Sequence, residues 1–162
     1  MIQPLVFTQV SGVTASDDDL GFGERQCGLK FPAAFCEFCR KYNGGFPDQQ
    51  NNFFFVPEKF AEFQAEFGRE DGFWAWGLYG LTTDLKQCDV IRVRESLAKL
   101  NIPLFPVAYD LTGNDVVIRI EDPEGAVFLR DHELWASTAK LFPIADNLEA
   151  FYNGLECSPF TD

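Results

Sequence analysis

The clearest structural signal in the chain is the run Val116-Val117-Ile118-Arg119-Ile120-Glu121-Asp122-Pro123-Glu124-Gly125-Ala126-Val127-Phe128-Leu129. Its two ends, 116–120 and 126–129, are rich in the β-branched and apolar residues that favour strands. Between them, Asp122-Pro123-Glu124-Gly125 matches a type I turn, which favours Pro at the second position and Gly at the fourth. The run therefore predicts a β-hairpin of two strands joined by this turn.

Strand signals continue on the N-terminal side of the hairpin. Residues 110–115 predict a turn with Gly113-Asn114 at its tip, and they follow the apolar run 104–108. Pro106 lies inside that run, and because proline has no N–H to donate, the run cannot be a central strand over its whole length. Two further strands are predicted at residues 53–56 and 73–79.

Helix signals lie on both sides of these strands. Ser16 followed by three aspartates is typical of a capped helix N-terminus, and Gly28 suits the end of that helix. A second helix is predicted with Pro32 in its first position and with Asn43-Gly44-Gly45 at its end. Apolar residues at helical spacing mark the inward faces of the second helix, of one capped by Asp89 and of a last helix: Phe35, Phe38, Cys39 and Tyr42; Val90, Val93, Leu97 and Leu100; Ile144, Leu148, Phe151 and Leu155. Helices that enclose one largely antiparallel or mixed sheet make the predicted fold class α+β.

Length and composition agree with a globular protein. The 162 residues predict a single domain over 1–162, and a hydrophobic content of 46% is ordinary for such a domain. The net charge is −12, so the surface repels phosphate backbones and anionic lipids, which argues against direct nucleic-acid binding. A basic protein partner is the natural complement, although acidity that serves solubility alone produces the same composition.

The sequence indicates a cytoplasmic protein. It contains no run of about 18 apolar residues that could cross a membrane, and it does not begin like a secretory signal. The cysteine count is 5, an odd number, which fits reduced thiols better than a disulfide framework.

Catalytic and metal-binding motifs are weak. Cys36 and Cys39 form a C-x-x-C pair, but they lie in a predicted helix with no second pair to complete a zinc site, so we expect them to be core residues. On a strand, the acidic neighbours of the only histidine, His132, would point to the face opposite to it, so the three side chains would not converge. No nucleophile motif, dinucleotide fingerprint, P-loop or calcium loop accompanies it. We therefore predict no catalytic residue, no cofactor and no metal.

The order of motifs resembles the SUKH superfamily, the cell-wall-synthesis-regulator homology group. The resemblance spans about residues 16–155. It follows, in order, the capped helix start and these segments: Gly28-Leu29-Lys30-Phe31-Pro32, Phe35, Phe38, Tyr42-Asn43-Gly44-Gly45, Phe105-Pro106-Val107-Ala108-Tyr109-Asp110, Gly113-Asn114, Gly125-Ala126-Val127-Phe128, Asp131-His132-Glu133, and Ile144-Ala145-Asp146-Asn147-Leu148-Glu149-Ala150-Phe151.

The resemblance implies protein binding rather than catalysis. Bacterial members of this superfamily are immunity proteins that block a cognate toxin, often a nuclease, and fungal members resemble signalling scaffolds. We therefore predict a non-enzymatic immunity-type protein that binds a basic toxin domain. The alternatives are a small hydrolase-type enzyme centred on His132 and a housekeeping interaction scaffold. The candidate partner-binding residues are exposed acids and two tryptophans that share one strand face: Asp17, Asp18, Asp19, Glu70, Asp71, Trp74 and Trp76.

Overall fold

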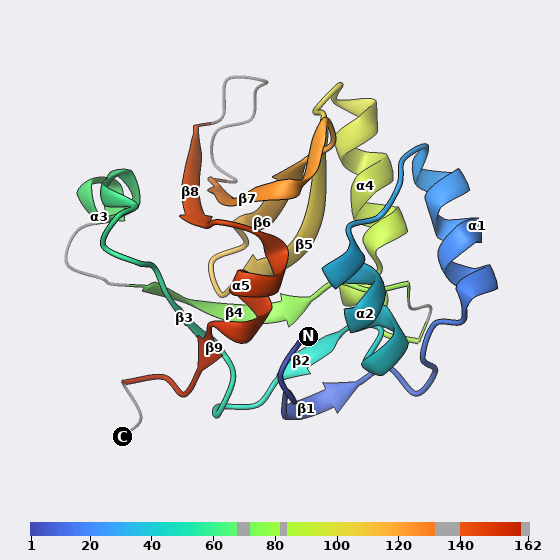
Figure 1. Cartoon of the computed structure of the whole chain (residues 1–162), viewed down its shortest axis with the longest axis horizontal. Helices are drawn as coiled ribbons and strands as arrows, with labels where there is room; N and C mark the ends of the chain where they lie inside the picture. Colours follow the sequence, from blue (N-terminus) through green and yellow to red (C-terminus); the bar gives the residue numbers. More distant parts are fainter. Residues whose placement is uncertain (68–71, 82–83, 132–139, 160–162) are drawn as a thin grey trace.

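A computed structural model describes residues 1–67, 72–81, 84–131 and 140–159 of the chain. In these residues one open sheet has the strand order β1-β2-β4-β5-β6-β7-β8, and its neighbouring strands pair antiparallel (Figure 1). Strand β3 pairs with both β4 and β9. The predicted α+β class is therefore confirmed. The strands are β1 (Phe7–Val10), β2 (Gly45–Pro47), β3 (Phe53–Phe55), β4 (Gly72–Leu78), β5 (Leu104–Asp110), β6 (Asp115–Arg119), β7 (Asp122–Arg130), β8 (Leu141–Ala145) and β9 (Leu155–Glu156).

Five α-helices accompany the sheet in the described residues, together with the 3₁₀ turn η1 (Lys86–Cys88). Helices α2 and α5 pack together, and α5 also packs on β7 and β8 (Figure 1). Helix α4 packs on β5 and against α1, while α3 contacts β8. The bounds of the helices are α1 (Asp17–Cys27), α2 (Ala33–Lys41), α3 (Ala61–Phe67), α4 (Val90–Lys99) and α5 (Leu148–Asn153).

The first two helices begin and end close to the predicted signals. Ser16 and Asp19 form a capping box at the start of α1, and Gly28 ends the helix with a left-handed φ of 68°. Pro32 precedes α2 as its N-cap rather than occupying its first position, because its ψ of 145° is extended. Asn43 and Gly44 follow α2 with positive φ values of 54° and 95°, which is the backbone that Asn and Gly tolerate best.

The β6–β7 hairpin is confirmed, but its predicted turn is wrong. Arg119 pairs with Asp122, so residues 120 and 121 form the turn. The Asp-Pro-Glu-Gly segment then lies inside β7, where the register shifts between the pairs at Ile118 and Arg119. This irregular segment has its own contact, because the Glu124 carboxylate accepts a hydrogen bond of 2.9 Å from the backbone N–H of Ala33 at the start of α2.

Strand β5 shows how a proline fits into the sheet. Pro106 pairs with Val117 of β6, and the register shifts between Pro106 and Ala108. The pairing of β5 with β4 runs from Ala108 to Asp110, beyond the proline. The apolar run 104–108 is therefore part of a central strand only beyond Pro106. This agrees with the prediction from proline's missing N–H.

The last helix is shorter than predicted. Ile144 lies in β8 and Leu155 in β9, while Leu148 and Phe151 alone belong to α5. All four side chains are buried, so their spacing indicated burial correctly but not one continuous helix. Leu100 follows the last residue of α4, and its side chain is 50% exposed. Its predicted position on the inward face of this helix is therefore wrong.

Candidate functional site

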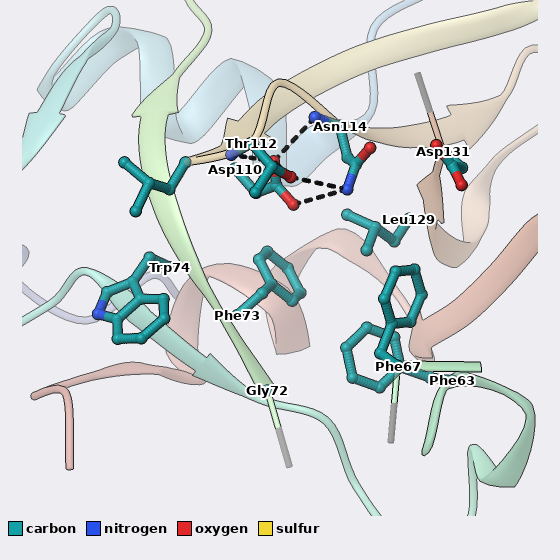
Figure 2. Close-up of a pocket in the computed structure, with 11 residues that line it drawn as sticks. Phe63, Phe67, Gly72, Phe73, Trp74, Asp110, Thr112, Asn114, Leu129 and Asp131 are labelled. Carbon is teal, nitrogen blue, oxygen red and sulfur yellow. Dashed lines mark hydrogen bonds between the residues drawn. The ribbon is translucent and has the colours of Figure 1, made fainter. Parts of the chain in front are cut away.

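A hollow lies where β4 begins, beside α3 and the β5–β6 turn (Figure 2). Its volume is about 420 Å³, within the range of small-ligand and anchor pockets. We call it the β4 hollow. Its lining combines aromatic and aliphatic side chains with a polar rim: Phe63, Phe67, Gly72, Phe73, Trp74, Asp110, Leu111, Thr112, Asn114, Leu129 and Asp131.

The rim of the β4 hollow is shaped by one aspartate. The Asp110 carboxylate accepts hydrogen bonds from the backbone N–H groups of Thr112 and Asn114, at 2.9 and 2.8 Å. The Thr112 hydroxyl and the Asn114 carboxamide donate two more bonds to it, each 2.9 Å (Figure 2). Gly113 has the positive φ of 92° that this tight turn requires. The turn predicted over 110–115 is thus present, and it fixes the carboxylate at the rim.

The apolar wall of the β4 hollow is a continuation of the core. Phe63 of α3 lies 4.8 Å from Phe67 and 6.2 Å from Phe73, measured between ring centroids. Trp74 stacks edge-on against Phe53 at 5.4 Å, and its indole N–H donates to the Ser158 hydroxyl at 3.2 Å. These contacts pack the rings of the wall against one another and against the core.

The described charged residues that line the β4 hollow are both acidic. Asp110 and Asp131 both line it, and the described lining residues include no lysine or arginine. A carboxylate beside an apolar wall interacts more strongly with a cation than it would in open water, because the local dielectric is lower. The arrangement suits a Lys or Arg side chain, whose aliphatic stem packs on apolar surface while its charged end reaches the carboxylates.

The two candidate tryptophans lie in different surroundings. Trp74 is partly buried at the β4 hollow, whereas Trp76 is 52% exposed and lies at a register shift between β4 and β5. The neighbouring Phe73 and Ala75 are buried, whereas both tryptophans are at least partly exposed. Only Trp74 contributes to the hollow with the two carboxylates.

The three aspartates of α1 lie at the other end of the molecule from α3, along the long axis of Figure 1. Asp17 pairs with Arg40 at 2.8 Å, and Asp19 is occupied in the capping box with Ser16. Asp18 has no hydrogen bond or ion pair with another described residue. The structure therefore does not bring this acidic group together with Trp74.

Three other sequence candidates lie outside the described residues: Glu70, Asp71 and His132. In the sequence, Asp71 precedes the lining residue Gly72, and His132 follows the lining residue Asp131.

The cysteines do not resemble a reactive pair. Cys39 is fully buried, and desolvation raises its pKa far above the ordinary value. Burial also raises the pKa of Cys36, and it raises the pKa of Cys27 and Cys88 to about 11. These thiols are protonated at neutral pH and are poor nucleophiles and metal ligands. Within the described ranges, no three His, Cys, Asp or Glu side chains are grouped so as to hold a metal ion.

Sequence reasoning missed the residues that make the β4 hollow. The sequence indicates only a turn for Asp110, and it assigns Phe67 to no candidate site. One signal was available, because Asp110-x-Thr112-x-Asn114 is a run of short polar residues that can bind their own backbone. Nothing in the sequence placed this turn beside β4, since that contact depends on the β4–β5 pairing.

The comparisons with known proteins agree with this architecture. The sequence model described as the SMI1 / KNR4 family (SUKH-1) matches residues 14–154. No curated protein matches the chain. In the described residues, no helix is long and apolar enough to cross a membrane.

Proposed function

The chain belongs to the SMI1 / KNR4 family (SUKH-1), and from this premise we propose that it is a non-catalytic, protein-binding domain. In our proposal it is an immunity-type protein of the cytoplasm. It captures a basic toxin domain and blocks that domain's active surface. A housekeeping scaffold would use the same type of surface, and the identity of the partner distinguishes the two.

The β4 hollow is the observation that carries this proposal. Its carboxylates, Asp110 and Asp131, stand beside a wall of aromatic rings, which suits an inserted Lys or Arg. Leu111 at the same hollow is 56% exposed and adds apolar area for the partner to cover. An anchored side chain in such a pocket is the usual form of an interface hot spot.

The net charge of −12 supports the same partner. The negative surface of this protein attracts a cationic domain. If that domain is a nuclease, the bound acidic protein competes with nucleic acid for its binding groove. In this proposal Trp74 forms part of the anchor pocket, and Glu70 and Asp71 add charge close to it in the chain. Asp17, Asp18, Asp19 and Trp76 contribute through charge or through contacts at the periphery.

The test begins with the partner itself. The tagged protein is used to capture proteins from a lysate of the cells that carry it, and captured proteins are identified by mass spectrometry. We expect a basic protein whose expression alone inhibits growth and whose toxicity is relieved by co-expression of this chain. A partner that is acidic contradicts the proposal, and a basic partner that is harmless removes its toxin part.

The anchor pocket is then tested with the purified partner by calorimetry. We expect Asp131→Asn and Leu111→Ala each to weaken binding by roughly 5- to 30-fold, a range typical of anchor residues. Glu95→Gln on α4 is the matched control, because it removes one carboxylate charge at an exposed site away from the hollow. Equal affinities for all three variants would show that the β4 hollow is not the interface.

A further inference from the structure

A second hollow lies on the part of the sheet formed by β1, β2 and β4. Its volume is about 510 Å³, and its described lining shares no residue with the β4 hollow. We call it the amide hollow because four carboxamide side chains line it, together with Thr8 and Trp76: Gln9, Gln49, Asn52 and Gln87. Charged residues make up 23% of the chain, yet the described lining residues here include none.

The four carboxamides of the amide hollow make no side-chain hydrogen bond with another described residue. Gln9, Gln49 and Gln87 are exposed to solvent. For Asn52 the missing hydrogen bond is a cost, because its side-chain oxygen is buried and has no partner in the structure. A buried acceptor without a donor is destabilising, so a bound group that donates to it is favoured.

Trp76 supplies the apolar part of the same site. Its side chain is 52% exposed, and it lies where the β4 register shifts between Ala75 and Gly77. Bulged positions re-aim a side chain and are frequent beside binding sites. An exposed indole next to unpaired amides offers a flat face for stacking and several donors and acceptors around it.

We infer that the amide hollow binds a neutral, polyhydroxylated ligand, namely a saccharide. Carboxamides both donate and accept, as hydroxyl groups do, so each can pair with a sugar hydroxyl in either sense. The C–H face of a pyranose ring matches the indole face in size. The absence of charge from the described lining gives no attraction for phosphate, carboxylate or ammonium groups.

A peptide fits the amide hollow less well. Peptides that add to a sheet pair with the backbone of an edge strand. The amide hollow includes Thr8 and Gln9 of the edge strand β1, but it extends across β2 to the side chains of β4, which lies inside the sheet between β2 and β5. A compact ligand that lies on the sheet face uses this lining, whereas an added strand would leave it empty. The inference does not rest on the proposed capture of a basic partner.

The experiment titrates the protein with neutral trisaccharides built from glucose, galactose, mannose or N-acetylglucosamine. Binding is followed by calorimetry and by the indole and side-chain amide signals in ¹H–¹⁵N NMR spectra. We expect at least one trisaccharide to bind and to shift the Trp76 indole signal, which is identified by its loss in Trp76→Phe. An uncharged Ala/Ser hexapeptide tests for peptide binding, and trigalacturonate tests for binding of a charged saccharide. We expect neither comparison ligand to bind.

Variants decide whether binding occurs at the amide hollow. Trp76→Ala is expected to weaken saccharide binding at least tenfold, and Gln87→Ala severalfold. Phe22→Ala is the matched control, because Phe22 is an exposed aromatic residue on α1. If no trisaccharide binds, if the hexapeptide binds instead, or if both hollow variants bind as the parent does, the inference is wrong. Because Gln87 is exposed, its variant keeps the test valid should Trp76→Ala fail to fold.

Discussion

Phe38 is the residue on which the packing between α2 and α5 depends most visibly. Its side chain is fully buried and stacks on Tyr152 of α5, with ring centroids 4.8 Å apart and planes 8° from parallel. It also contacts the rings of Phe7 and Tyr42. The helical spacing in the sequence predicted this burial, and the structure adds the partner that makes the contact specific.

Truncation of Phe38 tests this packing. We expect Phe38→Ala to lower the free energy of unfolding by about 3–5 kcal/mol, because it removes transfer energy and leaves a cavity. The measurement is urea unfolding followed by circular dichroism. Phe22→Ala, at a position that is 54% exposed, should change stability by less than about 0.5 kcal/mol. A loss below about 1 kcal/mol for Phe38→Ala would contradict the observed packing.

Cys88 makes stability depend on pH in the alkaline range. Burial raises the pKa of its thiol to about 11. An unfolded thiol ionises near pH 8.5, so the unfolded chain releases this proton first. Between about pH 9 and pH 11 the folded state holds more protons, and the free energy of unfolding must fall as the pH rises. Cys88→Ala should make that slope shallower in unfolding curves recorded across this range. A variant with lower stability but the parent's slope would contradict the assignment.

At the scale of elements, Asn43 lies just after α2 and links this helix to two other segments of the chain. Its carboxamide N–H₂ donates to the carbonyls of Val13 and Leu81, at 2.9 and 3.0 Å. Its oxygen accepts from the backbone N–H of Leu81 at 2.7 Å. The side chain therefore ties the end of α2 to the segment before α1 and to the end of β4.

Two substitutions separate the roles of Asn43. We expect Asn43→Ala to cost at least about 2 kcal/mol, because buried carbonyl and N–H groups lose their partners. Asn43→Gly loses the same bonds but tolerates the φ of 54° better, so it should be roughly 1 kcal/mol less destabilising than Ala. Thermal and urea unfolding of both variants provide the comparison. If Gly and Ala are equally destabilising, the left-handed backbone contributes nothing measurable.

The sequence predicts elements well where a local signal defines both their ends. Helix α1 has such signals at Ser16 and Gly28, and the predicted bounds agree with the observed ones. Strands β1, β2, β8 and β9 went unpredicted because they are two to five residues long and depend on partners elsewhere in the chain. The hairpin turn was misplaced for a related reason. Asp122-Pro123-Glu124-Gly125 is a sound turn sequence, but the register with β6 places it within β7.

At the scale of the whole molecule, the sequence predicts the chemical composition of the candidate site but not its location. Composition gives the acidity and the abundance of aromatic rings. Composition does not give the β4 hollow, because Asp110, Phe67 and Leu129 come from β5, α3 and β7, which the β5–β6 and β6–β7 pairings and the α3–β8 contact bring together. The fold also separates Trp74 from the aspartates of α1, although the sequence analysis names them together as candidate binding residues.

The net charge of −12 makes a prediction about how fast a basic partner binds. The charge of the whole surface attracts such a partner before contact, and salt screens this attraction over about 8 Å at physiological ionic strength. With the partner identified by capture, we expect the association rate constant to fall roughly tenfold or more between low salt and about 0.5 M salt. The dissociation rate should change much less, because it depends on contacts within the interface.

Charge reversal shows where that attraction is concentrated. Each change of an acid to lysine adds two positive units, so Glu70→Lys with Asp71→Lys and the control Glu95→Lys with Glu121→Lys alter the net charge equally. We expect the first pair to slow association more, since residues 70 and 71 directly precede Gly72 at the β4 hollow. Stopped-flow kinetics across a salt series measures both pairs. Equal slowing by both pairs would assign the effect to total charge. Salt-independent rates that neither pair alters would leave solubility as the sole role of the acidic surface, and the electrostatic part of the proposed function would fail.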